Sequence, residues 1–385
     1  MSLKNNYRAW AMVVCALLKF HCAPLPPGRQ SGEMAATEQN GPASLLTDRE
    51  VALFEPTKSD LKSLSKYESV EELSLSRKKP FTGDDIVHLK AIPELKVLSF
   101  RKAGVTNTGM QELGNLKRLQ ELTLRWRGRA TGRVSISDQG LCHLARLHSM
   151  RRLRVFCEGA SAVKGSKWIR DLAELKKLEE LVLGMSPSLR EKHLVDLSQL
   201  RQLRHLSISD GHEKVAKSVM GAIGEIKDLE SLALFRALVG DEALAALASL
   251  KDLESLSLVK CPNITGSGLA YLGHVQSLKS LSLKGSGITD KGIRGLVQFQ
   301  RLEDLNLSDT SIGPGVAQLK ELSQLKRLVL IGCQQLKADH LIPLAALDEI
   351  RSIDTSWSGV ELTDELRKAF KHKPLVFAAS GWPSL

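Results

Sequence analysis

Aromatic residues are scarce in this sequence: tryptophan, tyrosine and phenylalanine together make up 4% of its 385 residues. Hydrophobic residues still account for 43%, so aliphatic side chains, leucine above all, must supply most of the core. The six cysteines are scattered, and the absence of a CxxC pair argues against a disulfide framework or a zinc site. We expect the four cysteines after residue 100 to be reduced packing residues, namely Cys142, Cys157, Cys261 and Cys333.

A long hydrophobic run is also missing. The longest, AWAMVVCALL at 9–18, is too short to span a bilayer as a helix, so we predict no stable membrane span. Lys4 and Arg8 precede it, so residues 1–23 are either a leader for secretion or membrane tethering or an unprocessed N-terminal extension, and the localisation stays open. Residues 24–44 are rich in proline, glycine and polar residues and indicate a flexible linker.

The motifs of common enzymes are absent from the sequence. It contains no HExxH, GxSxG or kinase signature, and EGASAVKGSKW at 158–168 has the wrong spacing for a phosphate-binding loop. We therefore predict no catalytic residues, no cofactor and no metal site, and a protein that is not an enzyme.

A repeated pattern dominates the rest of the chain. From Val70 to Ile350 the strand motif LxxLxL recurs twelve times, at steps of 23 to 31 residues. A helical half follows many of the strands, as in VTNTGMQEL at 105–113 and ITDKGIRGL at 288–296. One unit alone cannot bury its apolar face, but stacked units form a continuous core.

These units resemble the leucine-rich repeat family over roughly residues 70–360. They are most similar to the cysteine-containing subtype, LxxLxLxxCxxITDxxLxxL, of F-box-associated and bacterial repeat proteins, although residues 1–69 show no F-box-like segment. Cys261 and Cys333 occupy the cysteine position in LESLSLVKC and LKRLVLIGC. The resemblance implies an α/β solenoid shaped like a horseshoe, with parallel strands on the concave face and short helices on the convex face.

The repeat pattern sets the expected domain boundaries. Residues 70–358 form a repeat domain of about 12 repeats. Residues 45–69, with Thr47 and Glu50 as a capping signal, predict an N-terminal helical cap, and residues 359–385 predict a C-terminal cap helix followed by a tail. Five aspartates at predicted helix starts are expected to be N-caps: Asp84, Asp138, Asp241, Asp290 and Asp339.

Large side chains interrupt a ladder of small hydroxyl residues on the predicted concave face. They predict that the horseshoe binds another protein. We expect the chain itself to be a monomer. The predicted contact residues are Arg101, Arg125, Trp126, Arg127, Arg129, Arg152, Arg154, Phe156 and Phe235.

An alternative rests on charge. The formal net charge of +11 permits attraction to acidic proteins, nucleic acid or anionic lipid. The insertion RWRGRATGRVS at 125–135 is rich in arginine, so nucleic-acid or anionic-surface binding near residues 125–154 is the second hypothesis. The single aromatic in this insertion weakens it, because single-stranded nucleic acids are usually held by several stacked aromatics.

Overall fold

The computed structural model of the chain describes residues 43–47, 49–66, 69–101, 104–127, 136–158, 167–184, 191–209, 217–373 and 376–378. All described residues belong to one unit, Pro42–Leu385. The predicted leader and most of the predicted linker therefore lie outside the described residues. Within the described part, no helix is both long and apolar enough to cross a bilayer.

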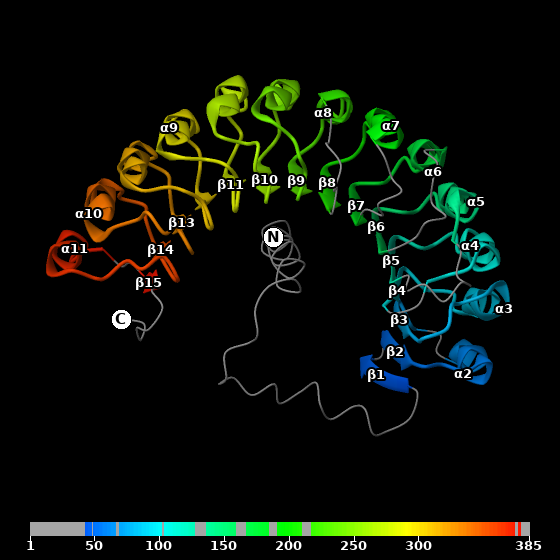
Figure 1. Cartoon of the computed structure of the whole chain (residues 1–385). Coiled ribbons are helices and arrows are strands. Elements are labelled where there is room, and N and C mark those ends of the chain that lie inside the picture. Colours follow the sequence, from blue (N-terminus) through cyan, green and yellow to red (C-terminus); the bar gives the residue numbers. More distant parts are fainter. Residues whose placement is uncertain are drawn as a thin grey trace. The chain divides into compact units, whose positions relative to one another are not determined.

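One open sheet forms the inner side of this unit, and its described strands pair in chain order (Figure 1). β1 and β2 are antiparallel, and every later neighbour is parallel. The strands are β1 (Ala43–Thr47), β2 (Glu50–Phe54), β3 (Glu72–Ser76), β4 (Val97–Phe100), β5 (Glu121–Arg127), β6 (Arg152–Glu158), β7 (Glu180–Gly184), β8 (His205–Ser209), β9 (Ser231–Phe235), β10 (Ser255–Val259), β11 (Ser280–Ser282), β12 (Asp304–Asn306), β13 (Arg327–Val329), β14 (Ser352–Asp354) and β15 (Val376–Ala378).

Short helices cover the outer side of the sheet, which curves with its strands inward (Figure 1). The α-helices are α2 (Lys58–Ser63), α3 (Gly83–Ile86), α4 (Asn107–Leu113), α5 (Asp138–Leu141), α6 (Lys167–Asp171), α7 (Glu191–Leu194), α8 (Lys217–Gly224), α9 (Asp290–Ile293), α10 (Ala338–Leu341) and α11 (Asp364–Ala369). The 3₁₀-helices are Leu64–Lys66, Val87–Ala91, Cys142–Arg146, Leu172–Glu174, Val195–Gln199, Asp241–Ser249, Ser267–Leu272, Arg294–Leu296, Pro314–Glu321 and Ile342–Ala346. Strands repeat about every 4.8 Å whereas helices need about 10 Å, which explains the curvature.

The twelve predicted strands are confirmed as β3–β14. Their leucines pair in register from strand to strand, as in Leu256 with Leu281 and Leu281 with Leu305. These residues are at most 1% exposed and join one continuous apolar cluster with the helix residues. Each buried leucine contributes roughly 2 kcal/mol, so the stack is stabilised by the sum of many small, similar layers.

The N-terminal end differs from the expected helical cap. Glu50–Phe54 is a strand that pairs with β3, and Ala43–Thr47 pairs with it in turn. The sequence EVALF places Val51 and Leu53 opposite Leu73 and Leu75, so it is a further layer of the same core. The first helix is α2, and its capping box is formed by Thr57 and Asp60. The expected capping residues, Thr47 and Glu50, lie ten residues earlier, in strands β1 and β2.

The C-terminal end closes with a helix and a strand. The predicted cap helix is present as α11, but it is shorter than 359–373 and its N-cap is Thr363. Beyond it, β15 pairs in parallel with β14, so part of the predicted tail extends the sheet.

The repeated aspartates are not N-caps. Thr82, Ser137 and Thr289 hold that position, and the aspartates lie inside the helical turn. Two of them bind the next repeat instead: Asp241 accepts a hydrogen bond from the Thr265 amide at 3.1 Å, and Asp290 accepts one from the Gly313 amide at 2.9 Å. These hydrogen bonds therefore connect neighbouring layers. Burial alone would raise the pKa of Asp241, but the hydrogen bonds from Thr265 and Ser267 outweigh it, so the pKa is lowered.

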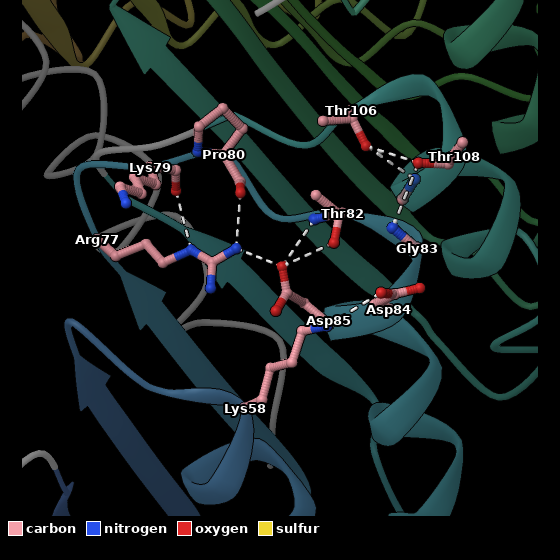
Figure 2. A network of polar contacts seen from close by, with 11 residues as sticks. Lys58, Arg77, Lys79, Pro80, Thr82, Gly83, Asp84, Asp85, Thr106 and Thr108 are labelled. Atoms are coloured by element: carbon pink, nitrogen blue, oxygen red, sulfur yellow. Dashed lines mark hydrogen bonds and ion pairs between the residues drawn. The ribbon is translucent and has the colours of Figure 1, made fainter.

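A network of polar contacts within one repeat lies near the N-terminal end (Figure 2). Arg77 pairs with the buried Asp85 and donates to the carbonyl oxygens of Lys79 at 2.9 Å and Pro80 at 2.6 Å. Asp85 also accepts from the Thr82 amide at 2.8 Å. This network fixes the loop between β3 and α3 without leaving a buried charge unpaired.

Candidate functional site

Side chains that face the concave side form rows across the sheet. The start row holds the first residue of each strand, such as Glu121, which pairs in register with Arg152 and then Glu180. The end row holds residues four positions later; it consists of Arg101, Arg125, Phe156, Gly184, Ser209, Phe235, Val259 and Lys284. Leucines at alternate positions face the core, so both rows lie on the face without helices.

Two of the predicted contact residues belong to an ion network across β5, β6 and β7. Arg152 pairs with Glu121, and its Nε lies 3.9 Å from a carboxylate oxygen of Glu180. Arg154 Nε donates to the other oxygen of Glu180 at 2.7 Å. The Glu180 side chain is only 4% exposed, so its charge is compensated by two arginines in a poorly hydrated place. The network of two arginines and two glutamates is close to neutral.

Two other predicted residues stack on each other. The guanidinium carbon of Arg125 lies 4.8 Å from the centre of the Phe156 ring, a favourable cation–π distance. Phe156 is 9% exposed, and the adjacent Gly184 leaves room for its ring, because a Cβ there would lie 2.5 Å from Phe156 Cδ1. Phe156 therefore holds Arg125 in place and offers little surface of its own.

A similar pair lies further along the end row. Lys260 Nζ is 5.9 Å from the centre of the half-buried Phe235 ring. Lys260 directly follows β10, and Arg101 directly follows β4, next to Arg125 in the end row. The structure thus groups Arg101 with Arg125 and places Phe235 four strands beyond β5.

The remaining predicted residues lie partly outside the described structure. Trp126 and Arg127 belong to β5, but their side chains are not described, and Arg129 falls in the insertion beyond residue 127. Their role as contact residues stays a prediction.

The concave face also has an acidic half, which the sequence pattern alone did not bring out. Glu50, Glu72 and Glu121 lie in the start row with Glu180, and the register of the repeats, already readable in LQELTL and LEELVL, could have placed them there. Loss of hydration raises the pKa of Glu72, and the charges of Glu50, Glu121 and Glu71 raise it further. Negative charge is therefore concentrated at the strand starts.

Histidine and cysteine side chains are dispersed over the described residues. No cluster of three or more His, Cys, Asp or Glu side chains suited to a metal occurs among the described residues. Cys261 and Cys333 are free and buried, and Cys142 is free and half-buried, while the side chain of Cys157 is not described. Burial lowers the pKa of His205, which lies beside Glu180 in the start row, and the charges of Glu230 and Glu180 act in the opposite direction.

Comparisons with known proteins agree with this architecture. The family model described as a leucine-rich repeat region matches residues 48–244, and a leucine-rich repeat model matches residues 274–297. No curated protein matches the chain significantly.

Solved structures of the same fold include an internalin from Listeria monocytogenes, at 18% identity and a TM-score of 0.56, with 87% of each chain covered. The crystal structure of the Rad7 and Elc1 complex in yeast matches at 16% identity and a TM-score of 0.54, covering 86% of this chain and 81% of that one. A leucine-rich repeat protein of Leptospira interrogans matches at 17% identity with a TM-score of 0.44, covering 82% of this chain and 91% of that one.

Proposed function

The chain belongs to the leucine-rich repeat family, a typical non-enzymatic interaction scaffold, and from that premise we propose that it binds another protein through the concave face over β5–β7. The observation that carries the proposal is the ion network of Glu121, Arg152, Glu180 and Arg154. Its side chains are fixed before binding, so docking loses little conformational entropy.

The neighbouring stack of Arg125 on Phe156 supports the same face. Arginine and aromatic residues dominate the energetics of protein interfaces, and here one orients the other. The binding surface is thus mainly polar and suits a partner that supplies its own hydrogen-bonding and charged groups.

The alternative of nucleic-acid or anionic-surface binding receives no support from Arg152 and Arg154. Both are paired with carboxylates, so a phosphate would have to compete with Glu121 and Glu180. Arg129, which belongs to the same hypothesis, lies outside the described residues.

Site-specific photo-cross-linking in the native cell tests the proposal. A photo-reactive amino acid replaces the half-buried Thr123, which lies between the two rows on β5, or Tyr271, which is 49% exposed on a convex 3₁₀-helix. We expect one protein of defined mass to cross-link at position 123 and not at 271. Cross-linking at 271 alone, or at neither position, would exclude the concave face as the contact surface.

A charge swap provides the energetic test. Arg154→Glu with Glu180→Arg keeps an opposite-charge pair but inverts it, and Asp304→Arg with Arg327→Glu does the same for the exposed pair on β12 and β13, whose atoms are 2.7 Å apart. We expect the first swap to weaken partner binding at least about tenfold and the second to leave it nearly unchanged. Circular dichroism of both variants checks that they remain folded.

A further inference from the structure

Charge is unevenly distributed across the concave face. Among the described residues the start row contains five carboxylates: Glu50, Glu72, Glu121, Glu180 and Asp304. In the end row between β4 and β11 no described residue is acidic, and the charged residues there are Arg101, Arg125 and Lys284. Arg236 and Lys260 add positive charge directly after β9 and β10. The ends of the strands therefore carry mainly positive charge on the concave face.

Three of these cations have no carboxylate partner among the described residues: Arg101, Arg125 and Lys260. They differ in this from Arg152 and Arg154, which are held by Glu121 and Glu180, and from Lys284, whose Nζ lies 3.3 Å from Asp309. Arg101 and Lys260 are exposed, and Arg125 is half-buried. An external carboxylate could bind the half-buried Arg125, which Phe156 orients, without displacing a described internal partner.

The spacing of the cations sets the length of a ligand. Arg125 lies in β5 and Lys260 directly follows β10, so they are separated by five strand spacings of about 4.8 Å, or about 24 Å. An extended chain covers that distance in about seven residues. Between the two sites the end row holds Gly184 and Ser209. Their side chains are absent or small, so the main chain of a ligand can pass close to the sheet.

The aromatic rings decide between a polypeptide and a nucleic acid. Phe156 is 9% exposed beneath Arg125, and Phe235 is half-buried near Lys260. Phe156 is covered by Arg125 and only Phe235 is partly accessible, whereas single-strand binding proteins rely on several aromatic rings for stacking.

We propose that the end row of β4–β10 binds an extended acidic segment of a partner protein, with carboxylates about seven residues apart engaging Arg101 and Arg125 at one end and Lys260 at the other. This inference rests on the proposed function and specifies the chemistry of the partner at that face. Phe156 and Phe235 act as positioning residues that orient the cations.

The test uses a fluorescent peptide with two glutamates at each end of a five-serine spacer, the full-length protein and fluorescence anisotropy. We expect binding that weakens at least about tenfold in Arg125→Glu and in Lys260→Glu, because each reverses a charge at one end of the site. Arg201→Glu is the matched control: Arg201 is exposed in the turn before β8, at the strand-start edge, and has no carboxylate partner among the described residues. That variant should bind within about twofold of the unaltered protein, as expected for a charge outside the contact surface.

Two further probes complete the experiment. A peptide with the four glutamates adjacent should bind more weakly, since it cannot reach both ends. A single-stranded oligonucleotide of similar length should also bind more weakly. Equal loss in all three variants, tighter binding of the oligonucleotide, or no binding of the spaced peptide would overturn the acidic-segment proposal. If cross-linking at position 123 persists in that case, the proposed function still stands; if cross-linking is absent while the peptide binds, only the protein partner at β5 is excluded.

Discussion

Single residues fix the loops within each layer of this solenoid, and Asp85 is the clearest case, because it holds the loop between β3 and α3 through Arg77 and Thr82. Its carboxylate is 3% exposed and pairs with Arg77, whose side chain is itself mostly buried. Replacing Asp85 with Asn leaves the guanidinium without a counter-charge. We expect the free energy of unfolding to fall by about 3 kcal/mol, measured by urea denaturation at neutral pH. Asp84→Asn is the control, because Asp84 is exposed and its pair with Lys58 is worth at most about 1 kcal/mol.

The same carboxylate makes a prediction about pH. Burial alone would raise the pKa of Asp85, but the hydrogen bonds from Arg77 and Thr82 and the charge of Arg77 bring it below the ordinary value. Its contribution to stability is therefore complete above the unfolded pKa of about 3.9 and is lost as the pH falls toward the folded pKa. The deficit of Asp85→Asn should shrink below about pH 4. A deficit that stays constant down to pH 3 would contradict the ion pair as its cause.

The cysteines of the repeat offer a separate residue-scale prediction. Burial raises the pKa of Cys261 to about 11 and also raises that of Cys333. Thiolate is the reactive form, so both residues should resist alkylation at pH 8 in the folded protein and react fully in urea. Peptide mass spectrometry identifies the labelled residue. Rapid labelling of Cys261 without denaturant would mean that the inner turn opens far more often than the packed core allows.

At the scale of the element, the turn after each strand repeats one strained conformation. In six successive repeats, from β9 to β14, the residue five positions after the first residue of the strand has a positive φ. These residues are Arg236, Lys260, Gly285, Asp309, Gly332 and Trp357. The left-handed region costs a non-glycine residue about 1–2 kcal/mol, whereas glycine adopts it freely. Two of the six repeats use glycine, so the turn geometry is required by the stack and the residue type is not.

This turn predicts substitutions of opposite sign. Trp357 has a φ of 62° and is 74% exposed, so Trp357→Gly removes strain with little loss of packing and should stabilise the protein by up to about 1 kcal/mol. Gly332→Ala should destabilise it by about 1–2 kcal/mol, because the new Cβ would be at positive φ and 2.6 Å from Asp309 Oδ1. Thermal unfolding measures both. Equal shifts of the same sign would show that backbone strain does not govern this turn.

The elements also show where sequence patterns mislead. Thr47 and Glu50 match a capping signal, but Val51 and Leu53 alternate with a period of two and complete a layer of the core. Burial of that alternating face outweighs the local helix signal, and the genuine capping box lies at Thr57 and Asp60. A capping motif therefore has to be weighed against the periodicity of the residues that follow it.

For the whole molecule, the fold could be predicted because each repeat supplies independent confirmation of the same pattern. The site could be predicted only in part. Alternation placed Arg125, Arg152 and Arg154 on the concave face, but it did not reveal that Glu180 pairs with two arginines while Arg125 has no acidic partner among the described residues. That distinction depends on which side chains lie opposite one another across neighbouring strands, whose paired residues are 26 and 31 residues apart in the sequence here.

The stacked core finally predicts how the molecule unfolds. Leu256 in β10 and Leu53 in β2 are both at most 2% exposed, yet Leu256 has several layers on either side and Leu53 lies near an end of the sheet. Either change to alanine leaves a cavity that costs about 3 kcal/mol. Because stability is passed between neighbours, Leu256→Ala should lower hydrogen-exchange protection from β3 to β14, whereas Leu53→Ala should mainly affect β1–β3. If Leu256→Ala altered β9–β11 alone, the layers would be unfolding independently, and the continuous apolar cluster would not act as one cooperative core.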